Sequence, residues 1–396
     1  MTLKPNLADE RGAVIVWFAF LLIALVAISA LAVDVGFMMA TRNELQNVAD
    51  SAALAGARQL GKIYQAMGSD VQDGYVLTGA DKSLIVTTVL DVADENTAGG
   101  VAEIKVKPED VEVGVWENHS FDGTAGLPNA NAVRVITRRD GTANPSVTTF
   151  FASMWKESYD LNAFATAALT GKGTAEPGEL ELPVGIDEYY FMPGGQCGQV
   201  IKFSPTTDPD ACAGWTTFEY APSNDPTIRK LLDEDPSYPS PEVVTDDSLF
   251  EFIGGDLSVP TFDNLLTAFQ RNGYDVDSAG NPILDLSGEP MADATGTGSE
   301  VPLTDEAGER LLYPDGTERN DHRWETTVVV YEANECGNPN QQMLIKGFAR
   351  ITITDVQGPP NKLIQGIIEC NLVDVGDTRG GGGDFGIFGS IPGLVE

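Results

Sequence analysis

The sequence predicts an α+β protein, in which a long N-terminal transmembrane and stalk helix precedes a small α+β block and a mainly β domain. Three observations support this fold class. Residues 12–33 contain no charged side chain. Residues 111–116 and 131–139 alternate apolar and polar side chains, as half-buried strands do. Three later β-rich runs, separated by turn residues, predict an antiparallel meander: 324–333, 342–356 and 362–373.

The uncharged run is long enough to cross a membrane. In a helix its 22 residues would extend roughly 33 Å, about the thickness of a bilayer core. Ala30-Leu31-Ala32 also fits the small-residue pattern of a signal-peptidase site, so cleavage before Val33 is the alternative. Residues 38–60 favour a retained anchor, because they contain no proline and continue the helical pattern to a C-cap at Gly61.

Two features of this helix suggest packing roles. Asp34 is its one acidic residue near the end of the apolar run, which suits either the lipid headgroup level or pairing with a partner helix. A face of small residues allows close helix approach, either to the protein's own sheet or to a partner. It consists of Ala49, Ala52, Ala53 and Gly56.

Composition divides the chain into six segments. They are a cytoplasmic tail (1–11), the anchor and stalk helix (12–60), an α+β block (61–171), a linker (172–179), an acidic mainly β domain (180–378) and a Gly-rich joint with an apolar tail (379–396). Within the block, 83–92 resembles a strand, 146–156 suits a short helix, and 160–171 fits either. A Ser, a Pro and a stop glycine predict a helix over 258–273. No internal repeat is evident.

The formal net charge is −35 at pH 7, and residues 172–396 hold 39 of the 59 acidic side chains. Such a field repels phosphate backbones, so nucleic-acid binding is not expected. It also repels anionic lipid, which leaves the apolar helix as the expected membrane contact.

The four cysteines, Cys197, Cys212, Cys336 and Cys370, all follow the anchor and have no zinc-type spacing. Their even number predicts two disulfides in an oxidising compartment, and hence a cytoplasmic N-terminus and an exported body. Three connectivities are open, of which the most local, Cys197–Cys212 with Cys336–Cys370, is favoured.

Motifs for catalysis or cofactor binding are missing from the sequence. There are only two histidines and no recognisable nucleophile–base pair, so neither enzymatic activity nor a cofactor is expected. Asp275 and Asp277 begin a segment like a calcium loop. The segment fails at Ala279 and at Leu286, where an EF-hand has its bidentate Glu, so a turn is favoured over a weak calcium site.

The last thirteen residues are unusually apolar for a solvent-exposed tail. Their large side chains could dock on a partner protein. These are Phe385, Ile387, Phe388 and Leu394.

Residues 11–58 resemble the N-terminal region of the Tad/Flp pilus-assembly family, specifically its TadG-like members. The resemblance lies in Arg11-Gly12, in the run AVDVG at 32–36 and in LQNVADSAALAGA at 45–57. The order of motifs extends it to about residue 171. It implies a single-pass inner-membrane protein with a small pilin-like block and a periplasmic or extracellular body. Trp17 stands where a prepilin has Glu, so processing at Gly12 is not expected.

The resulting hypothesis is a non-enzymatic component of Tad/Flp-type pilus assembly or secretion. Its expected partners are other components of that apparatus, and self-association is left open. The alternative is a tethered or secreted surface adhesin or ligand-binding protein.

Overall fold

The computed structural model describes residues 10–191, 198, 200–203, 212–255, 257–294, 297–304, 307–313, 316, 318–333, 337–358 and 362–396. These form two compact units. Unit 1 comprises 1–60, 76–168 and 394–396, and unit 2 comprises 61–75 and 169–393. In this division residues 61–75 belong to unit 2 and the last three residues belong to unit 1.

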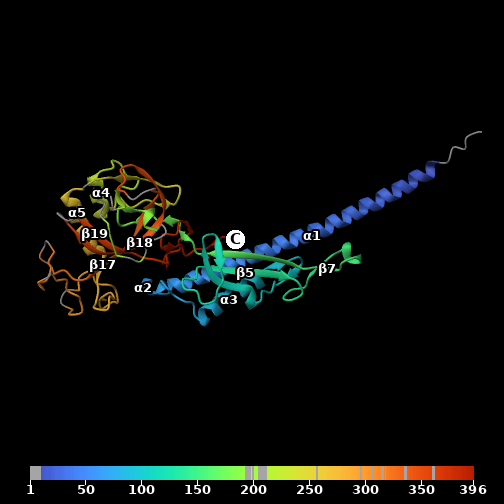
Figure 1. Ribbon diagram of the computed structural model, residues 1–396, viewed down its shortest axis with the longest axis horizontal. Coiled ribbons are helices and arrows are strands. Elements are labelled where there is room, and N and C mark those ends of the chain that lie inside the picture. The colour runs from blue at the N-terminus through green and yellow to red at the C-terminus, as the bar shows by residue number, and fades with distance from the viewer. Residues whose placement is uncertain are drawn as a thin grey trace, which may run out of the picture. The chain divides into compact units, whose positions relative to one another are not determined.

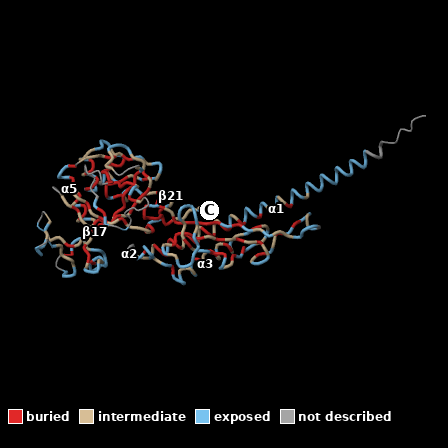
Figure 2. Tube along the Cα trace, in the orientation of Figure 1, coloured by how far each residue is buried: buried red, intermediate tan, exposed pale blue. Residues whose placement is uncertain are grey.

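The first helix, α1 (Glu10–Gln65), is one uninterrupted element of 56 residues (Figure 1). The predicted C-cap at Gly61 is wrong, because the helix continues through it. Space at this position is tight, because an added Cβ would lie 3.0 Å from the carbonyl oxygen of Ser390. Figure 2 shows the N-terminal part of α1 exposed, whereas side chains are regularly buried from Leu45 onward.

Unit 1 is built on a five-stranded sheet in the order β23-β8-β5-β3-β4. Its strands are β3 (Val111–Glu117), β4 (Ser120–Asp122), β5 (Ala132–Arg139), β8 (Leu161–Ala168) and β23 (Gly393–Leu394). β3 pairs antiparallel with β4 and β5, and β5 pairs antiparallel with β8. The smaller elements are β1 (Thr97–Ala98), β2 (Val101–Ala102), β6 (Val147–Thr148), β7 (Ser158–Tyr159) and the 3-10 helices η1 (Pro108–Asp110) and η2 (Ala152–Met154).

Two predictions in this unit are wrong. Residues 83–92 lie in a helix, α3 (Gly79–Asp94), and not in a strand. A capping box between Thr78 and Asp81 starts α3, and its buried residues recur every four positions, at Ile85, Val89 and Ala93. Residues 146–156 form the β6–β7 hairpin with η2 at its tip, not an amphipathic helix. Residues 160–171, left open by the sequence, supply β8.

Unit 2 contains an eight-stranded sheet in the order β12-β19-β18-β15-β13-β11-β17-β16. β17 also pairs with β18, which closes β18, β15, β13, β11 and β17 into a ring. The strands are β11 (Val184–Asp187), β12 (Val200–Phe203), β13 (Ala213–Thr216), β15 (Leu249–Ile253), β16 (Tyr274–Asp275), β17 (His322–Tyr331), β18 (Gln342–Gln357) and β19 (Leu363–Ile368). The predicted meander β17-β18-β19 is confirmed as antiparallel.

Both faces of this sheet are buried in unit 2. Along β17, Val328 and Val330 pack in one apolar core with α5 (Val259–Asn272), and Val329 and Tyr331 pack in the other. Burial on both faces explains the continuous apolar run of this strand. The predicted helix 258–273 is confirmed as α5. The remaining helices of the unit are α2 (Ser69–Gln72), η3 (Glu188–Phe191) and α4 (Asp225–Leu232).

Residues 276–318 contain a structural repeat that was not predicted from the sequence. Four isolated bridges recur with a spacing of eight residues within each pair: Val276↔Pro282 and Leu284↔Pro290, then Thr304↔Arg310 and Leu312↔Glu318. Glycines with positive φ stand in the four turns, at Gly280, Gly288, Gly308 and Gly316. The repeat is visible in the sequence only as turn residues, because few side chains in it are buried.

The predicted linker and the predicted glycine joint are paired strands. β9 (Gly171–Lys172) pairs with β21 (Gly380–Gly382), and the sheet continues through β22 (Ile387–Phe388) to β20 (Leu372–Val373). β10 (Thr174–Ala175) pairs with β14 (Val243–Val244). Glycine serves close strand packing here: a Cβ on Gly171 would lie 1.9 Å from the carbonyl oxygen of Gly383.

Candidate functional site

The candidate functional site is the exposed part of α1 and the loop that contacts it where the apolar run ends. From Val14 to Val33 nearly all side chains are apolar and exposed; Trp17, for example, is 75% exposed. In water this surface would be strongly unfavourable, at roughly 25 cal/mol for each Å². The helix is long and apolar enough to cross a membrane.

Asp34 is fully enclosed within unit 1, with 1% of its surface exposed. Its carboxylate accepts hydrogen bonds from the backbone N–H groups of Phe150 (2.8 Å), Phe151 (3.0 Å) and Ala152 (2.6 Å). It thereby caps the N-terminal end of η2. The packing role predicted for Asp34 is met within the chain itself, by this loop and not by a partner helix.

The small-residue face of α1 packs on the protein's own fold. Ala49, Ala52 and Ala53 have no exposed surface, and Gly56 is buried as well. A Cβ on Gly56 would lie 2.7 Å from Val89 Cγ2 and 3.0 Å from Val133 Cγ1, on α3 and β5. The sequence left open whether this face packs on the protein's own sheet or on a partner. In the structure it packs on the sheet, so it is not available to a partner helix.

Polar contacts hold the same stretch of α1 to the sheet. The Thr137 hydroxyl donates to the carbonyl oxygen of Leu45 at 3.0 Å, and the Gln46 amide donates to that of Phe164 at 2.8 Å. The helix therefore leaves the apolar run at Asp34 and enters the packed core of unit 1 within about three turns.

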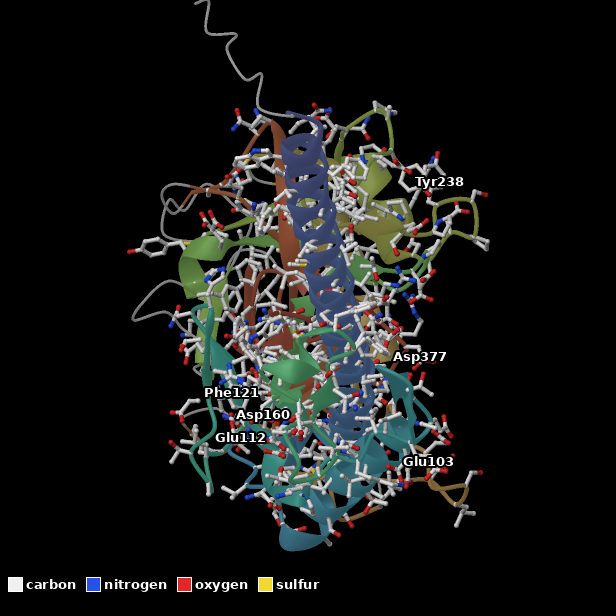
Figure 3. The ribbon with its side chains drawn as sticks, turned by 90° about the vertical axis from the view of Figure 1, so that its right-hand side faces the viewer. Glu103, Glu112, Phe121, Asp160, Tyr238 and Asp377 are labelled. Carbon is white, nitrogen blue, oxygen red and sulfur yellow. The ribbon has the colours of Figure 1, made fainter. Side chains whose placement is uncertain are left out.

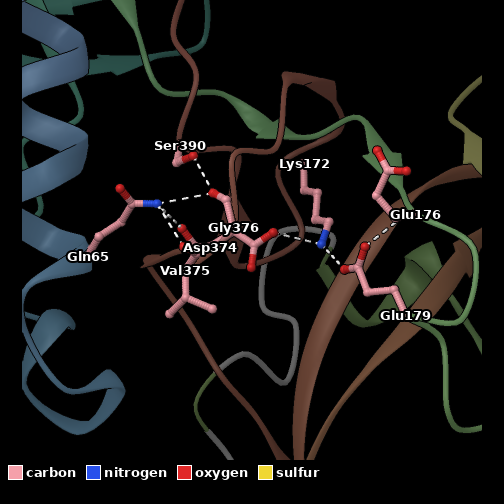
Figure 4. A network of polar contacts seen from close by, with 8 residues as sticks. All are labelled: Gln65, Lys172, Glu176, Glu179, Asp374, Val375, Gly376 and Ser390. Atoms are coloured by element: carbon pink, nitrogen blue, oxygen red, sulfur yellow. Dashed lines mark hydrogen bonds and ion pairs between the residues drawn. The ribbon is translucent and has the colours of Figure 1, made fainter.

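The last turn of α1 is bound into unit 2 by a polar network (Figure 4). The Gln65 amide donates to the carbonyl oxygens of Asp374 (2.9 Å), Val375 (3.1 Å) and Gly376 (3.0 Å). The carboxylate of Asp374 in turn contacts the ammonium of Lys172 at 2.7 Å. α1 thus contributes to both units, and this network was not predicted from the sequence.

Lys172 has no exposed surface and is paired with Asp374 and Glu179. Burial raises the pKa of Asp374, but the neighbouring ammonium outweighs this, and the pKa lies below its ordinary value. Burying a lysine with two carboxylates is costly. Removing the ammonium or the carboxylates would leave the remaining charge buried without a partner, which is strongly destabilising.

The calcium candidates are occupied by protein contacts. Asp277 accepts hydrogen bonds from the backbone N–H groups of Ala279 and Asn281, as an Asx turn does. Asp275 is buried and lies 2.8 Å from Nδ1 of His322, whose Nε2 lies 2.9 Å from the carbonyl oxygen of Phe269. The contacts of Asp277 are therefore those of the turn that the sequence favours.

Cys212 and Cys370 are both disulfide-bonded. The other two predicted disulfide residues, Cys197 and Cys336, lie outside the described residues. The pairing therefore stays a prediction.

Docking of the apolar tail on a partner is wrong for three of its four residues. Phe385 and Ile387 pack in the two cores of unit 2, and Phe388 is 6% exposed. Leu394 is 46% exposed in the edge strand β23. The tail is apolar because it completes the chain's own core. Within unit 1, the terminal Glu396 then pairs with Arg134.

Acidic side chains lie on the surface of unit 1. Figure 3 labels three of them, Glu103, Glu112 and Asp160, and all three are exposed. Phe121, labelled in the same view, lies 4.4 Å from the Arg134 guanidinium in a cation–π contact.

An exposed apolar helix that is long enough to cross a membrane and continues into the folded part of the chain is consistent with a membrane anchor. Residues 12–59 match the model of the putative Flp pilus-assembly TadE/G-like family. The matched segment covers the exposed run, Asp34 and the small-residue face. No curated protein and no solved structure matches the chain.

Proposed function

We propose that the protein is a non-enzymatic, membrane-anchored component of a Tad/Flp-type pilus-assembly or secretion apparatus. One observation carries the proposal: the TadE/G-like segment is both the exposed apolar helix and the core helix of the folded body. Movement or load on the body is therefore transmitted to the anchor through one continuous helix.

The acidic body lies in the periplasm or outside the cell, and its partners are other components of the apparatus. Support comes from Cys212 and Cys370, whose disulfides suit an oxidising compartment. The absence of an enzymatic role is inferred from the sequence.

Complementation tests this proposal. In the native host the gene is deleted and replaced by the full chain or by a chain in which 12–33 is exchanged for a cleavable signal peptide. We expect deletion to abolish the Flp-type pilus or its secreted product, full-length protein to restore it, and the released body to fail. The control is an equal level of both proteins in the cell envelope.

Restoration by the released body would contradict an anchored role and favour the secreted adhesin. Unchanged pili and secretion after deletion would overturn the assignment to the apparatus itself.

A further inference from the structure

The hairpin loop 149–156, called here the aromatic loop, exposes large apolar side chains. Phe150 is 60% exposed, Phe151 53% and Trp155 84%. Outside α1, the only other described Phe or Trp with comparable exposure is Phe164. Leaving such side chains in water costs about 1.5–3 kcal/mol each relative to burial, so a concentration of three in one short loop requires an explanation.

The loop is an ordered structure. The backbone N–H and the hydroxyl of Thr149 bond to the carbonyl oxygens of Glu157 and Lys156, which closes its base. η2 forms its tip, where the N–H groups of Trp155 and Lys156 both donate to the carbonyl oxygen of Ala152 at 2.9 Å. The aromatic side chains are thus held outward on a defined turn.

Asp34 sets the level of the aromatic loop along α1. It binds the N–H groups of Phe150, Phe151 and Ala152, and the ring of Phe37 lies 5.2 Å from that of Phe150 in an edge-to-face contact. Asp34 directly follows the uncharged run 12–33. A helix crossing a bilayer with this run therefore holds the loop at the boundary between acyl chains and headgroups. Figure 1 shows the β7 end of the hairpin reaching along α1 toward its N-terminal part.

We propose that the aromatic loop is an interfacial membrane anchor, in which Phe150, Phe151 and Trp155 enter the headgroup region of the bilayer that α1 crosses. Trp suits this region because its apolar ring carries a polar N–H group, and interfacial segments bury Phe rings at the same level. The proposal rests on the membrane-anchor part of the proposed function. It gives the body a second contact with the membrane, which restricts tilting of unit 1 about α1.

The surrounding charges decide which force drives the contact. Lys156 is the one basic residue of the loop, whereas the acidic residues Glu157 and Asp160 lie just after it. With a net charge of −35 on the chain, attraction to anionic lipid contributes little, and burial of the aromatic rings dominates. We therefore expect the contact to depend only weakly on ionic strength.

Tryptophan quenching in reconstituted full-length protein tests the proposal. The chain is placed in phosphatidylcholine vesicles that carry a spin label either near the headgroup or at the acyl end. In a Trp17→Phe variant, we expect the headgroup-level label to quench Trp155 about twofold more than the deep label, as for an interfacial ring. The signal is assigned by its loss on adding Trp155→Phe.

Trp17 serves as an internal standard, because it reports insertion of α1 itself. If Trp17 is quenched in the Trp155→Phe variant but Trp155 is not quenched in the Trp17→Phe variant, the loop proposal fails and the anchor stands. If neither is quenched, the anchor fails as well.

Two further variants separate the loop from general effects on folding. Asp34→Ala removes the carboxylate that holds the loop and should lower Trp155 quenching while Trp17 quenching is unchanged. Leu286→Ser removes an equally exposed apolar side chain elsewhere, at 109% exposure, and should change neither. Unchanged Trp155 quenching in Asp34→Ala would overturn the role of Asp34. Shielding of Trp155 only after addition of a partner protein would overturn the lipid contact.

Discussion

Individual carboxylates in this protein differ sharply in what their surroundings do to them. Asp34 is surrounded by three backbone N–H donors, and Asp374 by the Lys172 ammonium. Asp187, at the end of β11, has one donor, the N–H of Tyr189 at 2.8 Å, and its Oδ2 is buried without a hydrogen-bond partner in the described part of the chain. The sequence does not distinguish these three residues, because the difference lies in what other segments bring to them.

Asp187 makes the stability of the protein depend on pH. Burial raises the pKa of this carboxyl to about 6. Between about pH 4 and 6 the unfolded chain ionises the group while the folded chain keeps it protonated, so stability falls as pH rises through this window. We expect Asp187→Asn to be more stable than the parent at pH 8, by about 3 kcal/mol, and equal to it near pH 4.

Chemical unfolding of the full-length protein in detergent, followed by near-UV circular dichroism at both pH values, checks this. Asp277→Asn is the contrasting control. Backbone N–H groups of Asn281 and Ala279 hold the pKa of Asp277 below its usual value, so its contribution is lost only as pH falls through that lowered pKa, and its removal should destabilise at both pH values. A constant advantage of Asp187→Asn at all pH values would contradict the assignment.

At the scale of elements, α1 performs two tasks along one continuous helix. Its first half presents apolar side chains outward, and its second half presents alanine and glycine to α3 and β5. Small residues are required where the backbone of α1 approaches α3 and β5 most closely. The helical spacing of the buried residues therefore continues into the second half of α1, although their side chains are smaller.

Gly56→Leu tests the close approach. The new side chain would meet Val89 on α3 and Val133 on β5, so we expect a loss of about 3 kcal/mol in the stability of unit 1. Gly36→Leu is the matched control, since nothing lies within 4 Å of a Cβ at that position of the same helix. The measurement is hydrogen exchange of β5 and α3 amides. Equal exchange in both variants would show that α1 does not pack there.

At the scale of the whole molecule, the boundary between anchor and body lies near residue 34. In α1, burial begins at Asp34 and becomes regular from Leu45 onward. The predicted cleavage alternative after Ala32 would therefore release a body that keeps all of its packed residues.

Two truncations test this boundary. Removal of 1–33 should yield a soluble protein with cooperative unfolding. Removal of 1–60 also removes the core residues Leu45, Val48 and Leu60, worth about 1.5–3 kcal/mol each, which should unfold unit 1. Circular dichroism and size-exclusion chromatography distinguish the outcomes. A folded 61–396 fragment with an intact unit 1 sheet would contradict the packing described for α1.

The sequence by itself determined the fold class, the continuous anchor and stalk helix, and the antiparallel strands β17 to β19. These follow from local periodicity and run length, which a single segment carries. It failed for 83–92, where a capping box outweighs β-branched residues, and for the eight-residue repeat, whose side chains are mostly exposed. Tertiary structure alone decided that Asp34 holds the aromatic loop, that the small face of α1 packs on β5, and that the apolar tail completes the core. Each of these depends on which distant segment supplies the partner, and no local pattern contains that information.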